Sequence, residues 1–277
     1  MVGTRVGRTE ETTVVPELAS ERAGANERAT RRALARIGGV AALLGAVVFF
    51  VSGLLHPAGS DPNDLPAAFS EYVASPDWVG VHLAQLAGVA LIAVALLALE
   101  ATFEPGRAAA WARVGSAGAV ASLTLYAANQ GVDGVANHVA DHRWAAATGE
   151  ARALAFQAAF AVRQIEVALT SVFTLSLGCT LLVFGLAMLF SGRYPSWLGA
   201  IGMLGGLATA AIGLEQASHG FSGLALDLFM VVGPADLLWV CLTGVLMWRL
   251  ARRLASDGDD ARRRPAPRGL GEERPRV

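Results

Sequence analysis

Six apolar segments, each about as long as a lipid bilayer is thick, dominate this sequence of 277 residues. A helix needs roughly 20 mostly apolar residues to cross the hydrocarbon core of a membrane, and it satisfies its own backbone hydrogen bonds where no water can do so. The sequence therefore predicts an all-α fold, a polytopic bundle of six transmembrane helices within residues 34–250. The predicted spans are residues 37–56, 80–100, 113–133, 167–190, 197–216 and 225–248.

The composition supports a membrane protein and argues against nucleic-acid binding. Hydrophobic residues make up 54% of the chain and charged residues 16%, which are membrane-protein proportions. The formal net charge is -1, so the chain lacks the broad basic field that nucleic-acid binding requires, and we expect no nucleic-acid partner. Membrane lipid is the expected partner, and the sequence does not indicate an oligomeric state.

Both ends of the chain are charged and lack an apolar period. Residues 1–33 and the Arg- and Pro-rich residues 251–277 are predicted to be disordered tails. An even number of spans places both tails on one side. Most arginines flank that side, whereas only Arg143, Arg152 and Arg163 flank the other. Because basic residues favour the cytoplasmic side, the prediction is a multi-pass protein of the cytoplasmic (inner) membrane with both termini in the cytoplasm.

Two longer connections are predicted on the outer side. Residues 57–79 are acidic and are predicted to contain a short helix at 65–74. Residues 134–166 are Ala-rich, and we expect them to extend the third and fourth helices beyond the bilayer or to lie along its surface. Aromatic residues at the predicted boundaries are expected to anchor in the membrane interface: Tyr72, Trp78, Trp144, Tyr194 and Trp197.

Two passages carry a resemblance to a known family. The second span begins Asp77-Trp78-Val-Gly-Val-His82-Leu-Ala-Gln85, and the fourth leads into the fifth through Leu189-Phe-Ser-Gly-Arg193-Tyr-Pro-Ser-Trp197-Leu-Gly-Ala-Ile-Gly-Met-Leu-Gly-Gly206. Both resemble a family of bacterial six-helix membrane proteins known only as a domain of unknown function. The resemblance covers roughly residues 33–250. It implies a topology but no activity and no catalytic residues.

Polar side chains gather at the outer half of the predicted bundle. All five histidines map there, and four further polar residues recur at every fourth position, Asn129, Asp133, Asn137 and Asp141, which places them on one face of a helix. We expect an outward-opening polar pocket where the spans end. Its predicted lining is His56, His82, Gln85, Asn129, Asn137, Asp141, Arg163 and Asp227.

Two pairs of residues at helical spacing predict a metal site. His138 and His142 lie four residues apart, and Glu215 and His219 repeat that spacing on the fifth span. Together they offer a mixed nitrogen and oxygen ligand set for a Zn, Fe or Mn ion. The alternative is that these side chains meet water and headgroups at the interface.

Three carboxyl groups are the catalytic candidates. Asp236 lies near the middle of the last span, after Gly233-Pro234, where a charge costs at least roughly 2.5–3.5 kcal/mol and must face the interior. It is either a proton donor or polar anchor, or a neutral acid bonded to the backbone loosened by the proline. Asp133 and Glu166 are the others. Arg163 can pair with Glu166 three residues later, which favours an interfacial ion pair.

The sequence leaves three functional hypotheses open. The first is an intramembrane enzyme that acts on a lipid or isoprenoid by metal or acid assistance. The repeated Asn and Asp spacing resembles the motif with which intramembrane prenyltransferases hold Mg and a diphosphate, but a second such motif is missing. The second is a non-enzymatic protein, either a ligand-sensing or transporter-like bundle or a structural subunit. The third is haem ligation by two histidines such as His82 and His138.

Overall fold

The protein is helical throughout the residues that the structure describes. This computed structural model describes residues 11–263, and side chains for residues 22–256. The elements are α1 (Glu11–Leu55), α2 (Leu65–Ala74), α3 (Trp78–Glu100), α4 (Arg107–Gln130), the π-helix η1 (Gly131–Asn137), α5 (His138–Ala146), α6 (Gly149–Leu189), α7 (Ser196–His219) and α8 (Gly223–Arg263). Within this range there is no β-strand, which confirms the all-α prediction.

Five of these helices are long and apolar enough to cross a membrane, namely α1, α3, α6, α7 and α8. The remaining predicted span, residues 113–133, falls on α4 and the start of η1. α4 has 24 residues but contains Arg, Ser, Thr and Gly among its alanines, so it is less apolar than the other five. The structure thus supports a membrane protein with five candidate spans.

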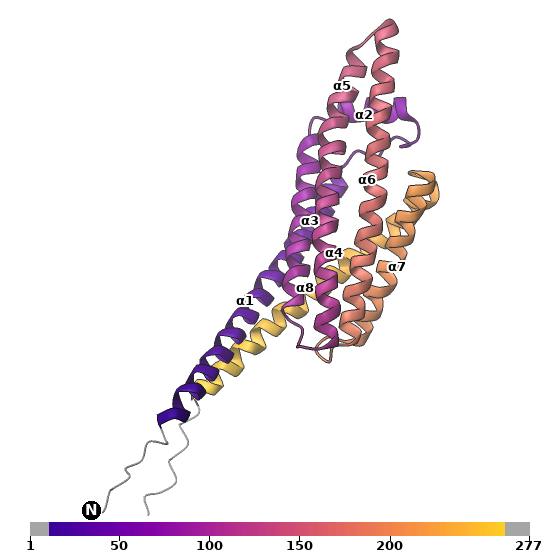
Figure 1. The fold of residues 1–277 in the computed structure, drawn as a ribbon. Coiled ribbons are helices and arrows are strands. Elements are labelled where there is room, and N and C mark those ends of the chain that lie inside the picture. The colour runs from indigo at the N-terminus through magenta and orange to yellow at the C-terminus, as the bar shows by residue number, and fades with distance from the viewer. Residues whose placement is uncertain (1–10, 264–277) are drawn as a thin grey trace, which may run out of the picture.

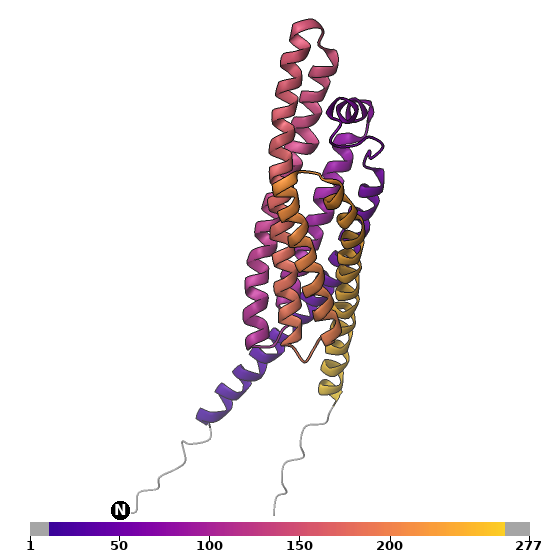
Figure 2. The ribbon, with the colours of Figure 1, turned by 90° about the vertical axis from the view of Figure 1, so that its right-hand side faces the viewer.

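The long helices run up and down side by side (Figures 1 and 2). α1 packs against α3 and α8, and α6 packs against α4 and α7. The start of α1 and the end of α8 lie at one end of the bundle, which we call the terminal end (Figures 1 and 2). The opposite end holds the end of α1, the start of α3, α5 and the end of α7, and therefore all five histidines; we call it the histidine end.

The predicted disordered tails differ from the structure over part of their length. α1 begins at Glu11, inside the tail predicted for residues 1–33, and α8 continues to Arg263, inside the tail predicted for 251–277. Ala-rich sequence without glycine clusters favours continued helix, and Glu27 pairs with Arg31 one turn later at 3.0 Å. Residues 1–10 and 264–277 lie outside the described residues.

The segment predicted to extend the third and fourth helices is indeed helical. η1 and α5 continue α4, and α6 then turns back as one helix of 41 residues. At 1.5 Å per residue α6 is about 60 Å long, roughly twice the thickness of a hydrocarbon core. The α5–α6 hairpin therefore projects beyond the other helices at the histidine end (Figures 1 and 2).

α6 and α7 are held together by close backbone contact. Five glycines at seven-residue spacing face each other across this interface; we call them the glycine seam: Gly178, Gly185, Gly199, Gly206 and Gly213. A Cβ atom on Gly178 would lie 2.3 Å from the Ala210 nitrogen, and one on Gly206 would lie 2.3 Å from the Leu182 nitrogen. Small residues let membrane helices approach this closely, and van der Waals packing then stabilises the pair.

Most of the aromatic residues expected in the interface are buried instead. Trp78, Trp144, Tyr72 and Tyr194 are all buried, and Trp197 alone of the five is exposed. Tyr194 packs against Phe103 at the terminal end. The other three are buried because of α2, which was correctly predicted at residues 65–74 and is capped by the Asp64 carboxylate. α2 inserts Phe69 and Tyr72 into a cluster with Trp78 and Trp144 at the histidine end.

Candidate metal centre

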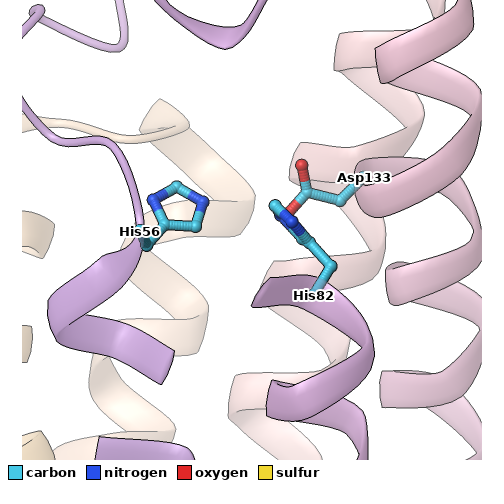
Figure 3. Close-up of side chains that lie close together, drawn as sticks. All are labelled: His56, His82 and Asp133. Carbon is cyan, nitrogen blue, oxygen red and sulfur yellow. The ribbon is translucent and has the colours of Figure 1, made fainter. Parts of the chain in front are cut away.

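Three potential metal ligands converge at the histidine end from three different elements. His56 follows α1, His82 lies in the second turn of α3, and Asp133 lies in η1. One ligand atom from each lies within 4.8 Å of the other two. Figure 3 shows the His56 ring facing the contact between His82 and Asp133. Among the described residues, these three side chains form the one group of at least three His, Cys, Asp or Glu residues whose ligand atoms lie close enough together to hold one ion.

Both imidazoles are oriented in the same way. Nδ1 of His82 lies 2.7 Å from the Trp78 carbonyl oxygen, and Nδ1 of His56 lies 2.8 Å from the Pro57 carbonyl oxygen. A carbonyl only accepts, so each Nδ1 must carry the proton. Metal-binding histidines are commonly held in this way, which leaves Nε2 for the metal. In His82 that Nε2 lies 3.1 Å from Oδ2 of Asp133, without the alignment of a good hydrogen bond.

Aromatic rings and one glycine fix the position of His82, which is 1% exposed. The Trp78 ring lies 4.3 Å from the His82 ring, and the Tyr72 ring lies 4.3 Å from Trp78 on the α2 side. Trp78 Nε1 donates to the Asp133 carbonyl oxygen at 3.2 Å. Gly134 lets η1 approach, because a Cβ atom there would lie 2.6 Å from Cβ of His82. The burial of Tyr72 raises its pKa to about 12, so its hydroxyl stays neutral.

The π-helix η1 divides the polar stripe that the sequence predicted. In α-helical geometry Asn129, Asp133, Asn137 and Asp141 share one face, but a π-helix bonds residue i to i+5 and turns less per residue. Asp133 consequently faces His82 on α3, whereas Asn129 and Asn137 bond to Thr170 and Glu166 on α6. The prediction of a single stripe is therefore wrong, because its members contact two different neighbouring helices.

A buried ion pair lies beside the candidate centre. Arg163 Nη1 donates to both carboxylate oxygens of Glu166, at 2.6 and 2.7 Å, and Asn137 Nδ2 donates to the same carboxylate. All three side chains are buried. This confirms the predicted pairing of Arg163 with Glu166, and it adds Asn137 as a third member.

Asp141 is fully buried, and neither of its carboxylate oxygens has a hydrogen-bond partner among the described residues. Burial raises the pKa of this carboxyl to about 7, the charge of Arg163 opposes the shift, and Asp133 adds to it. Asp133 Oδ1 and Asn137 Oδ1 are likewise buried without a partner. Buried polar atoms are usually hydrogen-bonded, so this concentration of free acceptors indicates a place where something else binds.

The two predicted metal-binding pairs are not brought into one ligand group. The rings of His138 and His142 stack with centroids 4.3 Å apart, and His142 is exposed. At the end of α7, His219 Nδ1 lies 3.0 Å from Glu215, which also accepts from Ser222. Helical spacing brings the two members of each pair together. His56, His82 and Asp133 come together for another reason, because they lie at the same depth on elements that are neighbours in the bundle.

The other predicted pocket residues are mostly enclosed instead of lining an open mouth. His82, Asn129, Asn137, Asp141 and Arg163 are buried. Gln85 accepts from Tyr126 and Gln130 at 3.4 Å each, farther into the bundle. Asp227 is exposed at the start of α8. A cavity of about 440 Å³ lies elsewhere, at the terminal end between the α3–α4 and α6–α7 loops.

Asp236 lies apart from this cluster. Its carboxylate accepts a hydrogen bond from the Thr209 hydroxyl on α7 at 2.5 Å. It also lies against Gly205 of α7, where a Cβ atom would lie 2.3 Å from Oδ1 of Asp236. Asp236 is therefore anchored by a neighbouring helix and not by the backbone near Pro234. Thr209 is ten residues below His219, about 15 Å along the helix. The catalytic roles of Asp236, Asp133 and Glu166 stay predictions.

The sequence did not predict that His56 would lie beside His82. It also did not predict that the rings of Tyr72 and Trp78 would pack next to His82. His56 ends the first span, His82 begins the second and Asp133 ends the third, so their equal depth was the available signal. No protein-family model, curated protein or solved structure matches this chain. The function must therefore be inferred from the geometry of the site.

Proposed function

We propose that this chain is a six-pass protein of the cytoplasmic membrane that binds a divalent transition metal through His56, His82 and Asp133. Both termini face the cytoplasm and the histidine end faces outward. The chain also belongs, in this proposal, to the bacterial six-helix family that its sequence resembles.

The arrangement of the helices supports six crossings. α4 joins the terminal end of α3 to η1 at the histidine end, next to α6, so the chain passes through the bundle there despite the lower hydropathy of α4. Half-exposed tryptophans mark the terminal end: Trp111, Trp197 and Trp248. Such residues favour the membrane interface, and the surplus of arginines favours the cytoplasmic side.

The depth of the site supports a position at the outer boundary of the membrane. His82 lies 18 residues from Glu100, the last residue of α3, which is about 27 Å along the helix. Since the hydrocarbon core is about 30 Å thick, the metal ligands lie where acyl chains give way to headgroups.

The observation that carries the metal proposal is the shared orientation of the two imidazoles. Each Nδ1 donates to a carbonyl, and one ligand atom of each histidine lies within 4.8 Å of a carboxylate oxygen of Asp133. Two ligands each about 2.0–2.2 Å from one metal ion lie about 3.0–3.5 Å apart, and the His82 to Asp133 separation is 3.1 Å. Two nitrogens and one oxygen favour Zn, Fe or Mn over Mg, and three protein ligands leave a coordination position open.

This site bears differently on the three earlier hypotheses. A metal with an open position could serve an enzyme that acts on a lipid or isoprenoid, as a Lewis acid, and it could equally serve a ligand-sensing bundle. Haem is disfavoured, because the His82 ring is enclosed by Trp78, His56 and Gly134 and leaves no room for a macrocycle.

The test is a metal titration of detergent-purified, metal-depleted protein. We expect one equivalent of Co²⁺ to bind with visible absorption bands, and Zn²⁺ to displace it. His56→Ala should weaken Co²⁺ binding by at least about tenfold, which corresponds to roughly 1.4 kcal/mol, with an unchanged elution profile. His142→Ala, an exposed histidine, is the matched control. A wild-type protein that binds no Co²⁺, or equal losses in both variants, would overturn the proposal.

A further inference from the structure

We propose that the metal centre accepts an anionic headgroup of the phosphate type, held between the open metal position and the guanidinium of Arg163. This inference rests on the proposed metal site and names the class of its ligand. Arg163 takes no part in metal ligation.

Arg163 is a buried cation with unused hydrogen-bond donors. Its side chain is almost fully buried, yet only Nη1 is hydrogen-bonded, to Glu166. Among the described residues, Nε and Nη2 donate to no acceptor. A guanidinium presents these donors as a planar fork that matches two oxygens of a phosphate or a carboxylate. The free edge of Arg163 is therefore suited to an oxyanion.

Aromatic rings hold the guanidinium in place. The Phe221 ring lies 4.8 Å from its central carbon and the Tyr72 ring lies 5.8 Å from it. Phe221 belongs to the α7–α8 connection, and Tyr72 belongs to α2, which also covers Trp78. Such contacts stabilise a cation, and more strongly when it is desolvated. They leave Arg163 preorganised for a ligand without satisfying its donors.

Arg163 also lies close enough to the metal ligands to act with them. The Tyr72 ring lies 5.8 Å from the guanidinium and 4.3 Å from the Trp78 ring, and the Trp78 ring lies 4.3 Å from that of His82. Asn137, one turn after Asp133 in η1, bonds to the carboxylate that Arg163 grips, so a short chain of contacts joins the two groups. The guanidinium and the proposed metal ligands therefore belong to one connected cluster at the histidine end.

The charge balance favours an anion over a second cation. A divalent ion and Arg163 supply three positive charges, and Asp133 and Glu166 supply two negative ones. Burial raises the pKa of Asp141 to about 7, so this carboxyl is largely neutral below about pH 6. The site thus keeps one net positive charge in a buried setting, where an anion with oxygen atoms relieves it.

Phosphate oxygens are available at this depth from two sources, a lipid headgroup or dissolved phosphate. The chemistry that the site would recognise is the same for both. A lipid source would place the headgroup at the metal and the acyl chains along the apolar outer surfaces of α1 and α8, on which Leu54, Leu55, Met230 and Val231 are exposed.

The experiment uses the Co²⁺-loaded full-length protein and follows its visible spectrum. Inorganic phosphate is titrated in one arm, and phosphatidic acid in mixed micelles is titrated in the other. We expect at least one of them to shift the Co²⁺ bands saturably. A response to the lipid alone assigns the ligand to a headgroup, and a response to inorganic phosphate alone assigns it to the dissolved anion.

The deciding variant is Arg163→Gln combined with Glu166→Gln, which removes the ion pair without leaving a buried charge. It should bind Co²⁺ within about twofold of wild type, but its response to the anion should be at least tenfold weaker. Arg152→Gln, on the exposed part of α6, should respond as wild type does. Co²⁺ binding without any anion response, or an equal response in the double variant, would overturn this proposal alone. Absence of Co²⁺ binding would overturn the metal site, and this proposal with it.

Discussion

The glycine seam and the candidate metal centre are built on opposite principles. Across the seam, α6 and α7 meet through backbone atoms, and no polar side chain is needed. At the candidate metal centre and the ion pair beside it, α3, η1 and α6 meet through charged and polar side chains, several of which have buried atoms without a partner. Close backbone packing adds stability, whereas unpaired buried polar atoms reduce it. The comparison indicates that the seam holds the bundle together, and it fits the proposal that the histidine end binds a ligand.

The seam should be the more sensitive of the two regions. In Gly178→Val, the new Cβ would lie 2.3 Å from the Ala210 nitrogen and 2.6 Å from the Gly206 oxygen, both backbone atoms that cannot swing away. We expect the two helices to separate and the folded protein to be lost, measured as the monodisperse peak in size-exclusion chromatography. Gly53→Val is the control, because nothing lies within 4 Å of a Cβ there. Normal yield of Gly178→Val would show that the seam is not the structural centre.

Breaking the ion pair at the histidine end should have the second-largest effect on stability. Arg163→Ala leaves Glu166 buried without its cation, and breaking such a pair costs about 3–5 kcal/mol. We expect a clear drop in melting temperature, followed by circular dichroism, whereas the double variant Arg163→Gln, Glu166→Gln should stay near wild type because no buried charge is left. If the single and double variants melt alike, the pair contributes through packing and not through charge.

The sequence predicts the helices well because apolar length is a local property. The apolar segments all fall on helices, five of which are candidate spans, and α2 appears at the predicted residues. The gathering of all five histidines at one end follows from the same reading, since counting spans fixes the depth of His56, His82 and His219. Depth along the membrane normal could thus be predicted for most of the candidate site.

Rotation of the helices could not be predicted in the same way. Which face of a helix meets which neighbour depends on close packing, such as that at Gly134 against His82, and on the π-helix η1. Spacing by four assumed an α-helix, so it grouped Asp133 with Asn137 and His138 with His142. The true group joins residues 26 and 51 positions apart, His56 with His82 and His82 with Asp133, and only the packed bundle shows it.

The smallest expected effect is a pH-dependent one at Asp141. Burial raises the folded-state pKa of this carboxyl to about 7, above its value of 3.8 in an exposed setting. The folded protein therefore binds the proton more tightly than the unfolded chain does. The stability due to the neutral acid is complete below about pH 4 and is lost as the pH rises through 7.

Asp141→Asn removes that titration and keeps the shape of the side chain. We expect the variant to have a higher melting temperature than wild type at pH 8.5, corresponding to a gain on the order of 1–2 kcal/mol in the free energy of unfolding. This difference should shrink as the pH falls toward 5. Thermal melts of both proteins across this range measure it, with the exposed Asp227→Asn as control. A constant difference at every pH would mean that Asp141 stays charged or paired in the folded protein. In that case the free acceptors at the histidine end would no longer distinguish it from the glycine seam.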